Sequence, residues 1–351
     1  MISLYKYGIK ENPWDDIERE KLENNKIMDR IKGQDVAVEK SISIIKRAKT
    51  GFSGLQHSSA SKPKGILFFA GPTGTGKTEL AKAIAELLFG DESACRRFDM
   101  SEYSESHSAQ KLFGAPPGYV GYEAGGQLTN TIKEHPFSLL LFDEVEKASP
   151  TIWDKFLQIL EDGRMTDGQG NTVYFSECLI VFTSNLGIYQ DVGGVKKRVV
   201  DMNMSYNELN KVVTKGIQDY FFSKGKPEVL NRIGKNLIVF NFIQPDAAKE
   251  ILLSQINKIC KAIYSMKKIS IKFGNDAVKE KLYKKVLTNL EEGGRGVGNI
   301  VEEYFTTPLS TYVFDNRVEN GQTITIEDIT GLNSEESELE MPRIIASLER
   351  I

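Results

Sequence analysis

The sequence lacks several features that would assign it to a special class of protein. Its longest apolar runs, such as residues 65–70 and 139–142, are far shorter than the roughly 20 residues that cross a bilayer. The three cysteines, Cys95, Cys178 and Cys260, are odd in number and include no close pair, so no disulfide framework is expected. The N-terminus has no apolar signal core. These absences predict a cytoplasmic protein without a membrane partner.

No excess of charge of either sign is present. The chain of 351 residues has 45 basic and 48 acidic residues, which gives a formal net charge of −3. This balance argues against a protein that grips nucleic acid through bulk positive charge, and no basic patch interleaved with aromatic residues is found. A DNA-handling role is therefore disfavoured. The hydrophobic content of 40% is that of an ordinary globular protein, and the length of 351 residues allows about two domains.

Short apolar runs alternate with helical patterns through much of the chain. We predict strands at 65–70, 96–99, 138–142, 178–183 and 236–241, and helices at 78–88 and 151–161, after a helical pattern that begins at Ile27. The strands are continuously apolar rather than alternating, which is typical of a parallel sheet covered on both faces. The predicted fold class is therefore α/β with a central parallel sheet.

The chain changes character after the last of these strands. Beyond Pro245, a long helical pattern is followed by alternating strands at 269–273 and 323–326, which predicts a smaller, mainly helical domain. The predicted parts are an N-terminal arm at 1–26, a large domain at 27–243, a small domain at 244–332 and a tail at 333–351. The tail is acidic and then places Ile344, Ile345, Leu348 and Ile351 on one potential helical face, so an amphipathic segment is expected there.

A glycine-rich segment lies between the first predicted strand and the helix after it. It consists of Gly71, Pro72, Thr73, Gly74, Thr75, Gly76, Lys77 and Thr78, and it follows the pattern G-x-x-x-x-G-K-[ST]. The glycines let backbone N–H groups surround phosphates at the positive end of the helix, Lys77 reaches the terminal phosphates, and Thr78 can bind Mg²⁺. The alternative is a chance glycine-rich turn.

Two carboxylates, Asp143 and Glu144, end a strongly apolar strand. We expect Asp143 to hold Mg²⁺ together with Thr78, and Glu144 to orient and polarise an attacking water. Asn185 ends the next apolar strand, where its amide could bind the water or the terminal phosphate. The alternatives are a solvated strand end for the carboxylates and a turn residue for Asn185. Their combination with the phosphate loop favours an enzyme that hydrolyses ATP.

Longer segments, all in one order, resemble the AAA+ ATPases of the Clp type, most closely the second ATPase domain of ClpB-like disaggregases. The similarity is carried by residues 97–103, 114–123, 143–148, 162–170 and 183–187 within the range 27–332. It implies an AAA+ P-loop fold with a small helical lid domain, and assembly into a homo-oligomer, expected to be a hexamer. The chain has no room for the other domains of those machines, so a single ring is expected.

The resemblance also implies roles for single residues. Ile31 matches the segment that lines the adenine pocket, Arg232 matches the arginine finger that reaches a neighbouring subunit's nucleotide, and Arg295 matches a second sensor of the terminal phosphate. The alternatives are a helix start for Ile31, a solvated surface side chain for Arg232 and a glycine-rich turn around Arg295.

A tyrosine between glycines resembles the substrate-gripping pore loop of that family. The segment is Gly118, Tyr119, Val120 and Gly121. An exposed aromatic between glycines can move and contact an extended polypeptide with little sequence demand, whereas the alternative is a tight turn with Tyr119 packed on the core. Residues 163–170 fit a second pore loop and a simple hairpin equally well.

Two functional hypotheses follow. The leading one is an ATP-driven ring that pulls on polypeptide substrates, with a dedicated adaptor as a further candidate partner. The second is a nucleotide-switched scaffold or partner-regulated remodeller without threading, in which the arm and the tail dock a partner. No Ile-Gly-Phe or Ile-Gly-Leu tripeptide lies between Asn185 and Arg232, so docking of a Clp peptidase is not expected.

Overall fold

The computed structural model describes residues 12–15, 17, 22, 26–51, 62–105, 107–119, 121–332 and 341–349. These residues divide into two compact units. The first takes its residues from Met1–Pro72 and Gly76–Asn241, and the second from Thr73–Thr75 and Phe242–Ile351. Each unit has a hydrophobic cluster of its own, so each is described by itself.

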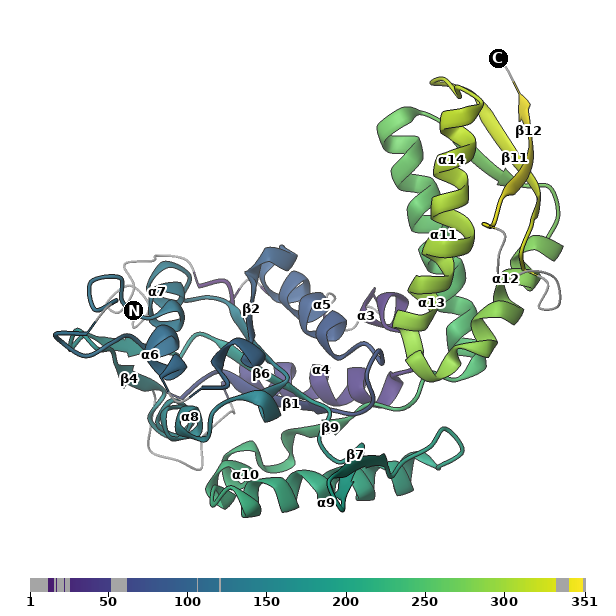
Figure 1. The fold of residues 1–351 in the computed structure, drawn as a ribbon. Coiled ribbons are helices and arrows are strands. Elements are labelled where there is room, and N and C mark those ends of the chain that lie inside the picture. Colours follow the sequence, from purple (N-terminus) through teal and green to yellow (C-terminus); the bar gives the residue numbers. More distant parts are fainter. Residues whose placement is uncertain are drawn as a thin grey trace. The chain divides into compact units, whose positions relative to one another are not determined.

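A five-stranded parallel sheet forms the centre of the first unit (Figure 1). Its strands lie in the order β2–β3–β6–β1–β9. Their bounds are β1 Gly65–Ala70, β2 Cys95–Asp99, β3 Leu139–Asp143, β6 Leu179–Ser184 and β9 Leu237–Val239. Every residue of β3 and of β6 is buried, because helices cover both faces of the sheet. The predicted α/β fold class is confirmed.

Alternate residues of the central strands face two helical layers. Leu67 and Val181 share a core cluster with α4 and α5 on one side. On the other side, the ring of Phe182 lies 5.7 Å from that of Trp153 in α8, and Trp153 meets Phe221 of α9 edge-on at 4.9 Å. Figure 1 shows α5 on one side of the sheet and α9 on the opposite side. The bounds are α4 Asp35–Lys49, α5 Lys77–Phe89, α8 Pro150–Asp162 and α9 Tyr206–Ser223.

Shorter elements complete the first unit. They are α3 Lys26–Arg30, α6 Ser108–Phe113, α7 Gln127–Glu134, α10 Pro227–Ile233, the paired strands β4 Arg164–Thr166 and β5 Thr172–Tyr174, the pair β7 Tyr189–Val192 and β8 Val195–Arg198, and the 3-10 turns η1 Glu92–Ala94, η2 Met100–Tyr103, η3 Val145–Lys147 and η4 Gly234–Asn236. The helical pattern from Ile27 is interrupted between α3 and α4, where Gly33 has a φ of 71°. A residue with this φ cannot continue a right-handed helix.

The second unit packs helices against a small sheet. Its elements are α11 Pro245–Lys267, β10 Ser270–Phe273, α12 Ala277–Thr288, η5 Leu290–Glu292, α13 Gly293–Val301, the π-helical turn η6 Glu302–Thr306, α14 Thr307–Asp315, β11 Thr323–Ile329 and β12 Ile344–Glu349. The sheet order is β10–β11–β12, so both strands predicted from alternation are present. Among the described residues, no helix is long and apolar enough to cross a membrane.

The N-terminal segment is not a detached arm where the structure describes it. Trp14, Ile17 and Leu22 are at most 7% exposed and belong to the core cluster of the first unit. The indole Nε1 of Trp14 donates a hydrogen bond of 2.9 Å to the carbonyl oxygen of Glu177. The polar composition of residues 1–26 concealed these few apolar anchors, and most of that segment lies outside the described residues.

In the tail, Ile344–Glu349 form strand β12 and not the helix whose apolar face the sequence suggested. β12 pairs antiparallel with β11, with Leu348 opposite Ile324. Ile344 is buried whereas Ile345 is 48% exposed, because neighbouring residues of a strand point to opposite faces. The apolar spacing fits both periods, and pairing with β11 decides between them. Ile351 and the acidic run at 333–340 lie outside the described residues.

Candidate nucleotide site

The carboxyl ends of the central strands meet at one edge of the sheet. Asp99 at the end of β2 is the register partner of Asp143 at the end of β3, and Ser184 at the end of β6 is the partner of Ala70 in β1. The loops that leave these strands therefore gather in one place. In open parallel sheets, ligands bind outside the carboxyl ends of the strands.

The glycine-rich loop connects β1 to α5. Gly71, Gly74 and Gly76 all have positive φ, of 146°, 76° and 96°. A Cβ atom on Gly71 would lie 2.7 Å from the carbonyl oxygen of Phe240, so glycine is required for this close approach. Pro72 and Thr75 are buried and Thr73 is exposed. The N-cap residue of α5 is Gly76, which has no side chain to cap the helix, and a helix N-terminus is suited to bind an anion.

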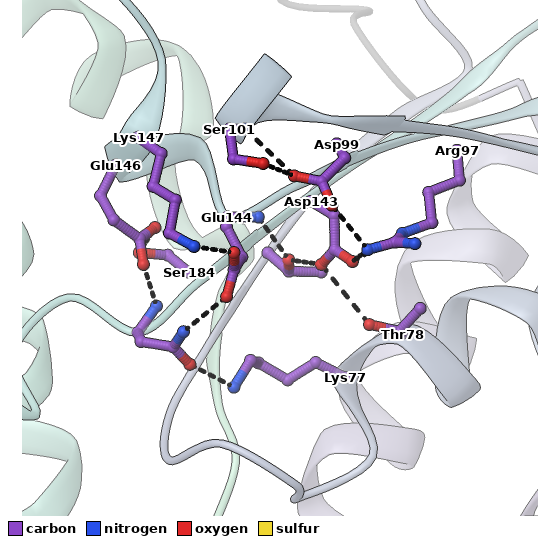
Figure 2. Close-up of polar contacts among 12 residues, drawn as sticks. Lys77, Thr78, Arg97, Asp99, Ser101, Asp143, Glu144, Glu146, Lys147 and Ser184 are labelled. Atoms are coloured by element: carbon purple, nitrogen blue, oxygen red, sulfur yellow. Dashed lines mark hydrogen bonds and ion pairs between the residues drawn. The ribbon is translucent and has the colours of Figure 1, made fainter. Parts of the chain in front are cut away.

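Lys77 lies inside this loop and is only 8% exposed. Its Nζ donates to the carbonyl oxygens of Gly71 at 2.8 Å and Pro72 at 2.7 Å. It also donates to Oδ1 of Asn185 at 3.0 Å, the contact drawn from Lys77 in Figure 2. A buried ammonium needs such acceptors because it has left bulk water. The charge is therefore fixed between the phosphate loop and the end of β6, where it would meet an entering phosphate.

Asp143 presents its two oxygens to different partners and is 7% exposed. Its Oδ1 accepts a hydrogen bond from Thr183 and lies 3.4 Å from Oγ1 of Thr78, while its Oδ2 accepts from Nε of Arg97 at 2.8 Å (Figure 2). A hydroxyl and a carboxylate together fit the oxygen preference of Mg²⁺, which usually takes few protein ligands beside phosphates and water. Arg97 was not predicted.

Glu144 has an uncommon backbone conformation, with a φ of 57°. Its N–H donates to Oγ1 of Thr183 at 3.1 Å, which holds this conformation. The carboxylate lies between two donors, Nδ2 of Asn185 at 3.5 Å and the ammonium of Lys147 (Figure 2). The hydrogen bond from Lys147 to Glu144 raises the pKa of the lysine, because the pairing favours its charged form.

Asn185 is held through its backbone by Glu146. One oxygen of the Glu146 carboxylate accepts from the N–H of Asn185 at 3.0 Å, and the other accepts from Oγ of Ser184 at 2.9 Å. The amide side chain of Asn185 then bridges Lys77 and Glu144. Glu146 and Lys147 lie in the run 143–148 that carries the family resemblance, but the sequence analysis assigned them no role. Their position just after Glu144 was the only feature of the sequence that could have indicated one.

Ile31 lies at the other end of the phosphate loop. It is 4% exposed, and its Cγ2 is 3.9 Å from the position that a Cβ of Gly76 would take. Gln34 fixes the segment by two reciprocal hydrogen bonds of 2.9 Å with the backbone N–H and carbonyl of Asn241. An apolar side chain beside the start of α5 fits the predicted contact with a base.

Arg232 and Arg295 are the two arginines to which the family resemblance assigns a role at a nucleotide. Arg232 in α10 pairs with Glu161 of α8, and its Nε is buried without a hydrogen-bond partner among the described residues. Arg295 is an exposed residue of α13 in the second unit. The hydrogen bonds described above for Asp143 and Glu144 do not involve Arg232.

Tyr119 is not packed on the core, since 61% of the residue is exposed. Gly118 and Gly121 have φ values of 86° and 91°, and a Cβ at either position would meet no atom within 4 Å. The tyrosine thus lies on a turn in open space. Val120 lies outside the described residues.

Comparison with known proteins agrees with this geometry. The family described as AAA domain (Cdc48 subfamily) matches residues 62–236. The chaperone protein ClpB of Bdellovibrio bacteriovorus is 38% identical over 298 residues, which cover 85% of this chain and 32% of that protein. ClpB of Lactiplantibacillus plantarum is 38% identical over 311 residues, 88% of this chain and 34% of that protein.

A plant relative shows the same extent of similarity. The mitochondrial chaperone protein ClpB4 of Arabidopsis thaliana is 35% identical over 298 residues, 85% of this chain and 30% of that protein. The chain thus spans about a third of the length of the curated relatives it matches. It belongs to the AAA+ ATPases and is a ClpB-like ATPase domain of that family.

Proposed function

We propose that this ATPase hydrolyses ATP to pull on polypeptide substrates, and so unfolds proteins or dismantles their complexes. The observation that carries the proposal is Tyr119, an exposed aromatic on a glycine-flanked turn. The relatives it matches are named as chaperones, which supports a protein substrate. An aromatic face contacts many side chains with little sequence demand, which suits a motor that handles varied chains.

In the proposed reaction, each site residue has a separate task. Lys77 and the N–H groups of the loop bind the phosphates of ATP, and Thr78 with Asp143 would hold Mg²⁺. Magnesium neutralises phosphate charge and orients the terminal phosphate when it is bound. Glu144 polarises the attacking water and accepts its proton, while Asn185 positions the terminal phosphate or the water.

The Glu144 carboxylate accepts a hydrogen bond from the ammonium of Lys147. When Glu144 acts as a base, the attacking water must reach the same carboxylate. The amide of Asn185, which lies beside the same carboxylate, gives Glu144 its other partner.

The finer parts of the proposal concern assembly and location. We propose a homo-oligomer, expected to be a hexamer, in which Arg232 reaches the nucleotide of a neighbouring copy and Arg295 senses the terminal phosphate. Ile31 would line the adenine pocket. The three cysteines are all free, which supports a reducing cytoplasmic location, and a dedicated adaptor stays a candidate partner.

A nucleotide-switched scaffold or partner-regulated remodeller is the second candidate function, and it needs the arm or the tail to dock a partner. In the described part of the tail, Ile344 is buried in β12, which pairs with β11. In the described part of the arm, Trp14 belongs to the core of the first unit. These residues support docking less than the exposed Tyr119 supports threading, so we favour the threading motor.

The test compares Tyr119→Ala with Tyr119→Phe in an assay that unfolds a tagged fluorescent protein. We expect the alanine variant to slow unfolding about tenfold or more, because it removes the aromatic face. The phenylalanine variant keeps the ring and should unfold the substrate nearly as fast as the original chain. ATP hydrolysis without substrate should stay within about twofold in both variants. Unfolding that is unchanged by Tyr119→Ala would remove the threading claim.

A further inference from the structure

The two ends of the loop that carries Tyr119 meet the β4–β5 hairpin. We call residues 114–126 the Tyr119 loop. A Cβ on Gly168, at the tip of the hairpin, would lie 2.1 Å from the carbonyl oxygen of Ala115. A Cβ on Gly114 would lie 3.2 Å from the N of Gly168 and 3.3 Å from the N of Gly126. Backbone therefore packs directly on backbone where the loop begins and ends.

Gln169 adds a side-chain contact further along the same loop. Its Nε2 donates to the carbonyl oxygen of Tyr122 at 3.0 Å and to that of Glu123 at 3.3 Å. These carbonyls belong to the limb that returns from Tyr119 toward α7. One amide group thus links the hairpin to the part of the loop that follows the exposed tyrosine.

The tip of the hairpin is itself held firmly. Asp167 is 5% exposed, and its carboxylate accepts from the N–H of Gln169 at 3.0 Å and that of Asn171 at 2.8 Å. It also pairs with Lys133 of α7 at 2.6 Å. Burial alone would raise the pKa of Asp167, but the hydrogen bonds from Lys133 and Asn171 lower it below its ordinary value.

The hairpin is also the direct continuation of the helix that leaves the nucleotide site. α8 begins shortly after Glu144 and Lys147 and ends at Asp162, and only Gly163 separates it from β4. The N–H of Phe175 donates to the carbonyl oxygen of Gly163 at 2.8 Å, which closes the base of the hairpin on the end of α8. A helix of 13 residues is about 20 Å long, so it joins two distant places as one stiff element.

We propose that the β4–β5 hairpin positions the Tyr119 loop, with Gln169 as the positioning residue, so that a shift of α8 at the nucleotide site moves the tyrosine. In this proposal, residues 163–170 support the gripping loop and are not a second one. The inference rests on the proposed function of Tyr119. Its first test, however, measures the loop alone and needs no substrate.

The first test is amide hydrogen exchange of the nucleotide-free full chain. Gln169→Glu keeps the shape of the side chain but turns an oxygen toward both carbonyls, and Gln169→Ala removes the group. In both variants, we expect exchange of amides within residues 116–126 to speed up about fivefold. Gln169→Lys retains a donor and should restore part of the protection. Gln190→Glu, at an exposed glutamine of β7, makes the same charge change and should leave this loop unaffected.

The second test measures how closely ATP hydrolysis is coupled to the unfolding of a substrate. If the hairpin transmits motion, Gln169→Glu should raise the ATP consumed per unfolded substrate about threefold or more, while basal hydrolysis stays within about twofold. Exchange of the loop that is the same in Gln169→Glu, Gln169→Ala and the original chain would overturn the proposal. Unchanged unfolding in Tyr119→Ala would instead overturn the proposed function, and faster loop exchange in Gln169→Glu would still support the hairpin contact.

Discussion

The carboxylate of Glu146 determines where Asn185 lies. It accepts one hydrogen bond from the N–H of Asn185 and one from the hydroxyl of Ser184 (Figure 2). The N–H of Leu186 donates to Oγ of the same serine at 3.0 Å, so the whole turn after β6 is tied together. Asn185 bridges Lys77 and Glu144. A displacement of this turn would therefore also displace the contacts of these two proposed reactive groups.

We therefore predict that Glu146→Ala lowers kcat on the order of tenfold or more, because small misplacements of a reacting group are costly. KM for ATP and the affinity for ADP should change by no more than about twofold, since Lys77 and the loop stay in place. Glu146→Gln should be nearly as active as the original chain. Its amide can accept from Asn185 while donating to the hydroxyl of Ser184, which rotates to accept. Steady-state kinetics measure both quantities.

A double variant separates positioning from general damage. If Glu146 acts only through Asn185, then adding Glu146→Ala to Asn185→Ala should lower kcat no further. Additive losses in kcat would show that Glu146 contributes to the reaction or the fold by another route. Equal activity of Glu146→Ala and the original chain would also contradict the prediction.

From the sequence, the residues at the carboxyl edge of the sheet could be predicted, but several of the side chains that bind them could not. Asp143 ends β3, Asn185 follows β6, and Lys77 follows the loop after β1. Parallel pairing brings these strand ends together. Arg97 lies on β2, and its ion pair with Asp143 depends on which strand lies next to β3. Strand order is a tertiary property that one strand's own residues do not reveal.

At the scale of the elements, the single residue Trp14 anchors the described part of the N-terminal segment to the core of the first unit. The indole ring is 3% exposed and meets Phe89 of α5 edge-on at 5.9 Å. Its Nε1 satisfies the carbonyl oxygen of Glu177 on a distant part of the chain. One aromatic residue thus joins the N-terminal segment, α5 and the segment before β6.

Trp14→Ala should lower the free energy of unfolding of the first unit by about 3–5 kcal/mol, as for other large buried side chains. Trp14→Phe keeps most of the apolar contact and loses the hydrogen bond, so we expect a loss of about 1–2 kcal/mol. Urea denaturation of the nucleotide-free chain measures both. Trp153, the other of the two tryptophans, is fully buried and reports the unfolding by its fluorescence. Equal midpoints for the three proteins would show that Trp14 is not an anchor.

Most elements could be predicted from the sequence because their apolar periods are long and unambiguous. β3 and β6 are continuous apolar runs, and α8 has a clear helical stripe. The prediction was wrong for β12, where residues 344, 345 and 348 suit a helix as well as a strand. Pairing with β11 decides that case, and no local pattern contains this information.

At the scale of the whole molecule, the role that we propose for Arg232 needs a second copy of the chain. It pairs with Glu161, yet its Nε is buried without an acceptor among the described residues. Buried N–H groups are rarely left unpaired, so an arginine in this state is suited to take another partner. The sequence indicates this role only through the family resemblance, because the proposed partner is the nucleotide of another copy.

Mixing two inactive variants tests the central claim most directly. Glu144→Gln cannot activate water, and Arg232→Ala cannot assist a neighbour, so each alone should hydrolyse ATP very slowly. In an equal mixture, an Arg232→Ala copy keeps Glu144 and receives the arginine of a Glu144→Gln neighbour. Random assembly in a ring then predicts recovery of about a quarter of the original activity. A mixture that is as inactive as its components, although labelled copies show that they assemble together, would contradict the account.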